Sequence, residues 1–217
     1  MKSGKKKVGL IRVLTTTDKV LLNVHGKLIE GWYPGLSIYS ACIPDQPEGI
    51  HDDKTEKIAI PKVLALAEKM AADGMEAIIV SCAGDPAVAL AGKQLSIPVI
   101  GAGRASAFAA RTLEKPVGVL SITAEVPKPV AKALGKYLAG YMVPDGVVST
   151  LDLMKPKGMK AVIAAGKKLK AGGAGLIVLA CTGLSTIGAA EKLRESLGIP
   201  VIDPVRAEAA MAWLAIM

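Results

Sequence analysis

The chain has 217 residues, of which 51% are hydrophobic and 21% are charged, enough to form one large domain or two small ones. This composition is typical of a globular protein and excludes an intrinsically disordered one. The formal net charge is +8, but only 3% of the residues are aromatic and the lysines are scattered, which argues against nucleic-acid binding and is compatible with mild steering of small anionic substrates.

Short β-branched runs alternate with Ala-, Lys- and Glu-rich stretches, as in an α/β protein with mostly parallel sheets. The predicted strands cover residues 7–14, 36–42, 76–81, 97–100, 117–122, 146–150, 175–180 and 199–202. The predicted helices cover residues 55–73, 86–95, 104–114, 127–139, 158–171, 184–197 and 204–216. The strands are apolar without alternation, which indicates burial on both faces. Asp85-Pro86 and Asp203-Pro204 are typical of helix starts with an N-cap Asp.

The two halves of the sequence repeat each other. Cys82 comes eight positions after Gly74 and Cys181 eight positions after Gly173, and an IPVI segment follows each cysteine. The repeat predicts two pseudo-symmetric parallel-sheet domains of the flavodoxin or Rossmann type, with an active site in the cleft between them. We place the N-terminal half at residues 1–105, completed by the C-terminal helix 204–217, and the C-terminal half at residues 106–203.

Four polar side chains lie at predicted strand ends, namely those of Thr15, Cys82, Thr123 and Cys181. Ligands of open parallel sheets bind at the carboxyl ends of strands, so two halves packed face to face would offer two thiols to one molecule. Glycines after each cysteine allow close approach, and the following helices supply N–H groups that bind an oxyanion and lower a thiol pKa. Two thiols on opposite faces suit proton removal and return at a carbon beside a carbonyl. The alternative interpretation is a pair of buried core thiols.

The three cysteines have no close spacing, which argues against a disulfide scaffold and fits a reducing cytoplasm. Cys42 has no counterpart in the repeat and is interpreted as structural. The N-terminal apolar run is short and contains Arg12, so it predicts no signal peptide, and no apolar run reaches the roughly 20 residues that a membrane helix needs. We therefore expect a cytoplasmic protein with no membrane partner.

Two segments carry a family resemblance that covers nearly the full chain. Residues 81–107, SCAGDPAVALAGKQLSIPVIGAGRASA, and residues 180–205, ACTGLSTIGAAEKLRESLGIPVIDPV, resemble the aspartate/glutamate/hydantoin racemase superfamily, and the first is most similar to the hydantoin-racemase branch. The resemblance implies a two-domain α/β fold, racemisation without cofactor or metal, Cys82 and Cys181 as the acid/base pair, and a homo-oligomer. The chain departs from the amino-acid racemases, which show Cys-Asn-Thr and Cys-Thr-Glu where it has Cys-Ala-Gly and Cys-Thr-Gly.

The sequence therefore predicts a racemase or epimerase acting on a small anionic or amide-containing substrate: an amino acid, a hydantoin or a related acid. The expected substrate contacts come from Thr15, Ala83, Gly84, Thr123, Thr182 and Gly183. Gln46 and His51 are candidates for the cavity rim, because their Pro-containing loop follows a predicted strand. The alternatives are a decarboxylase or a cis-trans isomerase of the same superfamily, or a non-catalytic small-molecule-binding module.

Overall fold

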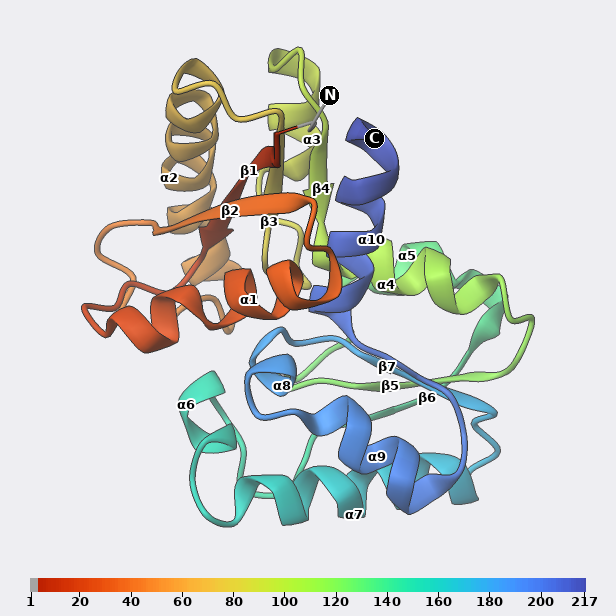
Figure 1. Ribbon diagram of the computed structural model, residues 1–217. Helices are drawn as coiled ribbons and strands as arrows, with labels where there is room; N and C mark the ends of the chain where they lie inside the picture. Colours follow the sequence, from red (N-terminus) through yellow and green to blue (C-terminus); the bar gives the residue numbers. More distant parts are fainter. Residues whose placement is uncertain (1–3) are drawn as a thin grey trace.

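The apolar runs of the sequence form two four-stranded parallel sheets in the computed structural model, which describes residues 4–217 (Figure 1). The first sheet has the order β2-β1-β3-β4 and consists of β1 (Lys6–Arg12), β2 (Leu36–Cys42), β3 (Ala77–Val80) and β4 (Val99–Gly101). The second has the order β6-β5-β7-β8 and consists of β5 (Val117–Leu120), β6 (Leu138–Met142), β7 (Leu176–Leu179) and β8 (Val201–Ile202). The equivalent order confirms the predicted pseudo-symmetric α/β fold.

The helices that follow the strands in chain order are α1 (Lys19–Trp32), α2 (Asp53–Ala72), α3 (Val88–Gln94), α4 (Ala102–Arg111), α5 (Lys128–Leu134), α6 (Thr150–Leu153), α7 (Gly158–Ala171), α8 (Gly183–Thr186), α9 (Ala189–Leu197) and α10 (Pro204–Ile216). A short 3₁₀ turn, Gly135–Tyr137, joins α5 to β6. Asp203 caps α10 as predicted, because its carboxylate accepts from the N–H groups of Val205 and Arg206.

Each sheet is buried on both faces because successive side chains of a strand point to opposite sides. In β3, Ile78 and Val80 pack with α2 and α3, whereas Ile79 packs with α1 and α10. In β7, Leu179 packs with α7 and α9, whereas Val178 packs with α4 and α5. These strands lack polar alternation because both of their faces are buried in the core.

Helices α4 and α10 each follow one sheet in the chain but pack against the other sheet. Helix α4 follows β4 of the first sheet, but Ala107 packs in the cluster of the second sheet. Helix α10 follows β8 of the second sheet, but Val205 and Ala209 pack in the cluster of the first, beside which it lies in Figure 1. On this packing we propose the division given by the sequence, with residues 204–217 in the N-terminal half; residues 1–3 of that half lie outside the described part of the chain.

One predicted strand is wrong. Residues 146–150 form a turn and the start of α6, and β6 forms instead at residues 138–142. Gly146 has a φ of +75°, which breaks an extended run. Ser149 and Asp152 then form a capping box that begins α6. The β-branched segment Val-Val-Ser-Thr therefore leads into a helix instead of a strand, because Ser149 caps that helix.

The helices of the structure also differ from the predicted ones in three places. Helix α1 was not predicted, although Asp18 supplies its N-cap by accepting from the N–H groups of Val20 and Leu21. The predicted helix 184–197 is two helices, because Gly188 adopts a φ of +67° between α8 and α9. The predicted helix 127–139 ends at Leu134, where the chain turns into β6.

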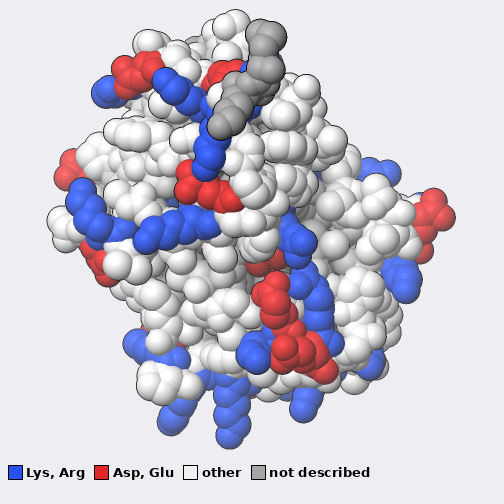
Figure 2. Space-filling view, in the orientation of Figure 1, with Lys and Arg blue, Asp and Glu red and all other residues white. Residues whose placement is uncertain are grey.

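On the face shown in Figure 2, Lys and Arg side chains extend from several elements, with Asp and Glu side chains between them. Across residues 4–217, none of the helices combines the length and the apolar character required to cross a bilayer.

Candidate active site

A cavity of about 350 Å³ lies between the two halves, where strands of both sheets end. Its walls come from residues that follow β1, β3, β5 and β7, and from the segments that lead into α2, α5 and α6: residues 12–14, 48–53, 56, 81–84, 122–129, 150–151 and 180–183. In the order β2-β1-β3-β4 the strand order reverses between β1 and β3, the point at which ligands of such sheets bind. The cavity therefore lies where the topology predicts a site.

Cys82 and Cys181 both line this cavity, and both are half-buried. Each comes two residues after the third strand of its own sheet, β3 for Cys82 and β7 for Cys181. The structure therefore brings the two predicted thiols to the walls of one cavity from equivalent positions.

The turn that carries Cys82 is held by a side chain that reaches another helix. The Cys82 carbonyl accepts from the N–H of Asp85, at 3.1 Å. The Asp85 carboxylate accepts from the N–H groups of Gly103, at 2.7 Å, and Arg104, at 2.9 Å. The prediction that Asp85 caps its own helix is therefore wrong, because it caps α4. Burial raises the pKa of Asp85 to about 6, against the hydrogen bonds from these two N–H groups.

The turn that carries Cys181 packs against α6. The Cys181 carbonyl accepts from the N–H of Leu184, at 3.1 Å, and the Thr150 hydroxyl lies 4.0 Å from the sulfur. A Cβ at Gly183 would collide with the Thr150 methyl group and would lie 3.4 Å from the sulfur. Glycine is thus required here by close approach.

The expected lowering of the thiol pKa is wrong, because burial raises the pKa of both thiols above the usual range: a thiolate loses solvation there. A backbone N–H two residues further along the chain opposes this in each case, that of Gly84 for Cys82 and that of Gly183 for Cys181. The neighbouring Cys181 raises the pKa of Cys82 further, because two thiolates would repel each other. The glycine two residues after each cysteine is thus a repeated feature that is already visible in the sequence.

A buried polar layer joins the halves near the two thiols. His25 lies between two hydroxyl groups, with its Nδ1 3.0 Å from Ser81 and its Nε2 2.9 Å from Thr186. The Ser81 hydroxyl donates to Glu208, at 2.7 Å, and the Thr182 hydroxyl donates to the Ser81 carbonyl, at 3.1 Å. Burial lowers the pKa of His25 well below its usual value, so the ring is held neutral. The residues adjacent to the two cysteines, Ser81 and Thr182, are thus connected directly.

The structure places most of the other predicted contacts at the cavity, but not all of them. Residues in its walls are Ala83, Gly84, Thr123, Thr182, Gly183 and the rim candidate His51. Within the wall, the Thr123 hydroxyl donates to the Glu125 carbonyl, at 2.7 Å. Two candidates, Thr15 and Gln46, are not among the wall residues.

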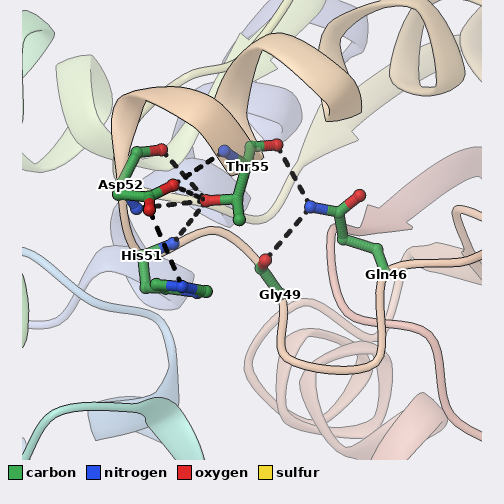
Figure 3. Close-up of polar contacts among 5 residues, drawn as sticks. All are labelled: Gln46, Gly49, His51, Asp52 and Thr55. Carbon is green, nitrogen blue, oxygen red and sulfur yellow. Dashed lines mark hydrogen bonds and ion pairs between the residues drawn. The ribbon is translucent and has the colours of Figure 1, made fainter.

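Thr15 and Gln46 shape the loop that forms the rim. The Thr15 hydroxyl donates to the Ile43 carbonyl, at 2.6 Å, and accepts from the N–H of Gln46, at 2.7 Å. The buried Gln46 amide donates to the carbonyls of Gly49, at 3.2 Å, and Thr55, at 3.1 Å (Figure 3). Both side chains are therefore used by the backbone of the loop, which is why they do not reach the cavity.

The same close-up shows how the loop enters α2. Asp52 and Thr55 form a reciprocal capping box, in which the Thr55 N–H donates to the Asp52 carboxylate at 2.7 Å (Figure 3). The His51 ring lies 3.9 Å from the Asp52 carboxylate. The rim is thus a braced segment that holds His51 at the cavity.

Arg12 and Thr150 are among the wall residues that were not predicted from the sequence. Arg12 ends β1 and lines the cavity although its side chain is only 5% exposed. An Arg inside an apolar strand is the signal that could have revealed it, since Arg is rarely buried without a purpose. Thr150 was predicted to lie in a strand, and no local pattern brings it to Cys181.

Residues 13–212 match the sequence model of the family described as Asp/Glu/Hydantoin racemase. The chain belongs to this family. A hydantoin racemase of Pseudomonas sp. (strain NS671) is 25% identical over 172 residues, which cover 73% of this chain and 66% of that protein. A hydantoin racemase of Rhizobium meliloti is 27% identical over 174 residues, which cover 77% of this chain and 71% of that protein. The match thus spans about two thirds of the length of these relatives.

Solved structures share the fold of this racemase-family chain. Allantoin racemase from Pseudomonas fluorescens superposes with a TM-score of 0.82 at 22% identity, over 96% of this chain and 89% of that one. A variant of arylmalonate decarboxylase superposes with a TM-score of 0.71 at 15% identity, over 98% of this chain and 93% of that one. Racemases and a decarboxylase therefore have this architecture in common.

Proposed function

We propose that this protein is a cofactor-independent racemase or epimerase that inverts a carbon alpha to a carbonyl group. The observation that carries the proposal is the placement of Cys82 and Cys181 in the walls of one cavity, at equivalent ends of two pseudo-symmetric sheets. A molecule bound between the halves would have one thiol on each side. Membership of the racemase family supports the same reaction class.

The proposed reaction moves one proton at each face of the carbon. A thiolate takes the alpha hydrogen, so the C–H bond breaks and an S–H bond forms, and the electron pair passes to the carbonyl oxygen as an enolate. The opposite thiol then gives its proton to the other face of the carbon and becomes the thiolate. Each sulfur therefore acts as a base in one direction and as an acid in the other.

The backbone beside each cysteine is the proposed binding site for the enolate oxygen. Ala83 and Gly84 on one side, and Thr182 and Gly183 on the other, lie in the walls where turns lead into helices. N–H groups aimed at an oxygen that gains charge stabilise the transition state more than the substrate. The hydroxyl groups of Thr15 and Thr123 donate to loop carbonyls, so the proposal gives them no role in binding the oxygen.

A hydantoin or a related uncharged cyclic amide is the proposed substrate class. The curated relatives are named hydantoin racemases, and a structural neighbour is named an allantoin racemase. The wall charges support the same choice, because the carboxylates outnumber the cations. The carboxylates belong to Glu48, Asp52, Asp53, Glu56 and Glu125, and the permanent cations to Arg12 and Lys128. An uncharged amide is repelled less by such walls than a dicarboxylate would be.

The raised thiol pKa values set the expected pH dependence. Because burial raises the pKa of both cysteines, the thiolate population grows as the pH rises through the neutral range. We expect kcat/KM to increase from about pH 7 to about pH 9, since the base must be ionised before it can accept a proton. A rate that falls over this range would contradict a thiolate base.

The test is incubation of the protein in deuterated water with single enantiomers of a 5-substituted hydantoin, allantoin and aspartate, and separately with an arylmalonate, which is achiral. Proton NMR follows exchange at the alpha carbon, and polarimetry follows optical rotation. The proposal predicts alpha-hydrogen exchange together with loss of rotation for the cyclic amides. Release of carbon dioxide from arylmalonate would indicate a decarboxylase instead, and binding without exchange would indicate a non-catalytic module. A homo-oligomer in the cytoplasm is the further expectation, for which size-exclusion chromatography tests the oligomeric part.

A further inference from the structure

Arg12 is a buried cation with no carboxylate partner among residues 4–217. Its guanidinium donates through Nη1 to the carbonyls of Leu21, at 2.7 Å, and Leu22, at 3.3 Å. No ion pair joins it to a carboxylate within the described chain. A buried charge is costly unless it is paired or well hydrogen-bonded. A counter-charge in the adjoining cavity would therefore bind favourably beside it.

Four ionisable groups lie close enough to Arg12 to interact with its charge: Cys42, Glu208, Cys181 and His25, whose ring is held neutral. Glu208 is fully buried, accepts from Ser81, and keeps its second oxygen without a partner among the described residues. Burial raises the pKa of Glu208 well above its usual value, which favours the neutral acid. Cys42 is paired with Arg12 in the register of β1 and β2, but it lines a different hollow, beside Pro44 and Lys62. Cys181 alone of the four lines the same cavity as Arg12.

The surroundings of the two cavity thiols are unequal. Cys181 faces the N–H groups of Gly183 and Leu184, the Thr150 hydroxyl and the Arg12 guanidinium, all of which favour its ionised form. Cys82 faces one such N–H group, that of Gly84, and two carboxylates that oppose ionisation, those of Asp85 and Glu56. The remaining ionisable groups in the cavity walls are Glu48, His51, Asp52, Asp53, Glu125 and Lys128.

We propose that Arg12 is a positioning residue that serves as counter-ion to the Cys181 thiolate, so that Cys181 is the base and Cys82 the acid in the resting protein. Arg12 belongs to the N-terminal half and acts on the thiol of the C-terminal half. The pseudo-symmetry of the fold is thus broken in its electrostatics. The assignment of a base and an acid rests on the proposed racemase function.

The test measures each thiol alone, without substrate. Cys42→Ser/Cys82→Ser leaves Cys181 as the single thiol, and Cys42→Ser/Cys181→Ser leaves Cys82. The rate of alkylation by iodoacetamide is recorded from pH 6 to pH 11 for both proteins, because the rate follows the thiolate population. We expect Cys181 to react faster near neutral pH and to titrate at the lower pH. Equal titration, or a more acidic Cys82, would overturn the proposal.

Substitution of Arg12 identifies the source of the difference. Arg12→Gln should slow alkylation of Cys181 about tenfold near neutral pH, which corresponds to one unit in its pKa, and should change Cys82 far less. Arg12→Lys keeps the positive charge and should restore most of the Cys181 rate. An equal loss at both thiols, or a raised substrate KM with unchanged Cys181 titration, would refute the counter-ion role. If Arg12→Gln does not fold, the comparison of the two single-thiol proteins and the Arg12→Lys result still decide.

These measurements separate the inference from the function on which it rests. The thiol titrations need no activity, so they can fail while racemisation is observed. Conversely, racemisation can be absent in every substrate while Cys181 is still the more acidic thiol and depends on Arg12.

Discussion

Gly103 lies where helix α4 touches the turn that carries Cys82. A side chain at this position should therefore displace that turn, and with it the Cys82 thiol. A Cβ at this position would lie 2.9 Å from the carbonyl carbon of Ala83, and closer still to its oxygen. Carbon atoms in contact are about 3.5–4.0 Å apart, so the turn has to move by about 1 Å to accept a methyl group. The movement falls on the segment between Cys82 and Asp85, because the Asp85 carboxylate is bound to the N–H of Gly103.

We therefore expect Gly103→Ala to lower kcat/KM by about a hundredfold, the usual effect of misplacing a reacting group by about 1 Å. The control is Gly92→Ala in α3, where nothing lies within 4 Å of the added Cβ. This variant should keep full activity and gain up to about 1 kcal/mol of stability, since alanine is the better helix former. Racemisation is followed by polarimetry, and circular dichroism checks that both variants are folded. Full activity in folded Gly103→Ala would refute the argument that the glycine positions Cys82.

Three further predictions concern stability. The pKa of Asp85 is raised to about 6 from 3.8 by burial, so its contribution to stability is present at low pH and is lost as the pH rises from about 4 through 6. In urea titrations, the free energy of unfolding of Asp85→Asn should therefore rise by about 3 kcal/mol, relative to that of the natural protein, between pH 4 and pH 7. A difference that does not change with pH would contradict the raised pKa. Thr182→Val should lower the free energy of unfolding by about 1 kcal/mol, because the hydrogen bond to the Ser81 carbonyl is lost, and an unchanged midpoint in urea would show that this bond contributes nothing. Lys128→Gln breaks the exposed ion pair with Asp53, at 3.0 Å, and should leave the melting temperature unchanged at low and high salt; a salt-dependent loss would reveal a stabilising latch across the cavity.

The parts of the fold that could be predicted are those where the local pattern and the tertiary structure agree. The runs AIIV and LIVL are buried on both faces, and each leads through a turn to a cysteine, so periodicity, glycine placement and the repeat gave the same answer. Residues 138–142, LAGYM, carry a glycine and no β-branched side chain, and they form a strand only because β5 lies beside them. Local preference therefore misplaced this strand by several residues.

The candidate site was predictable to the extent that topology fixes it. Parallel strands of equivalent order bring Cys82 and Cys181 to one cavity, and that follows from the repeat. Thr15 and Gln46 lie near the edge of the sheet where the site is expected, but their side chains bind backbone groups of their own loop. Sequence spacing does not reveal these hydrogen bonds. Arg12 was visible as a lone cation in an apolar strand, but the sequence does not show that this strand end lies at the cavity.

The most direct test of the central claim is alpha-hydrogen exchange in deuterated water with Cys82→Ser and Cys181→Ser, each assayed with both enantiomers of a substrate accepted by the natural protein. We predict that both variants fold and that neither interconverts the enantiomers at a rate above about a thousandth of the natural one. Any exchange retained by a variant should be confined to one enantiomer, opposite for the two variants. Undiminished racemisation by either folded variant would contradict a mechanism in which both sulfurs handle the proton.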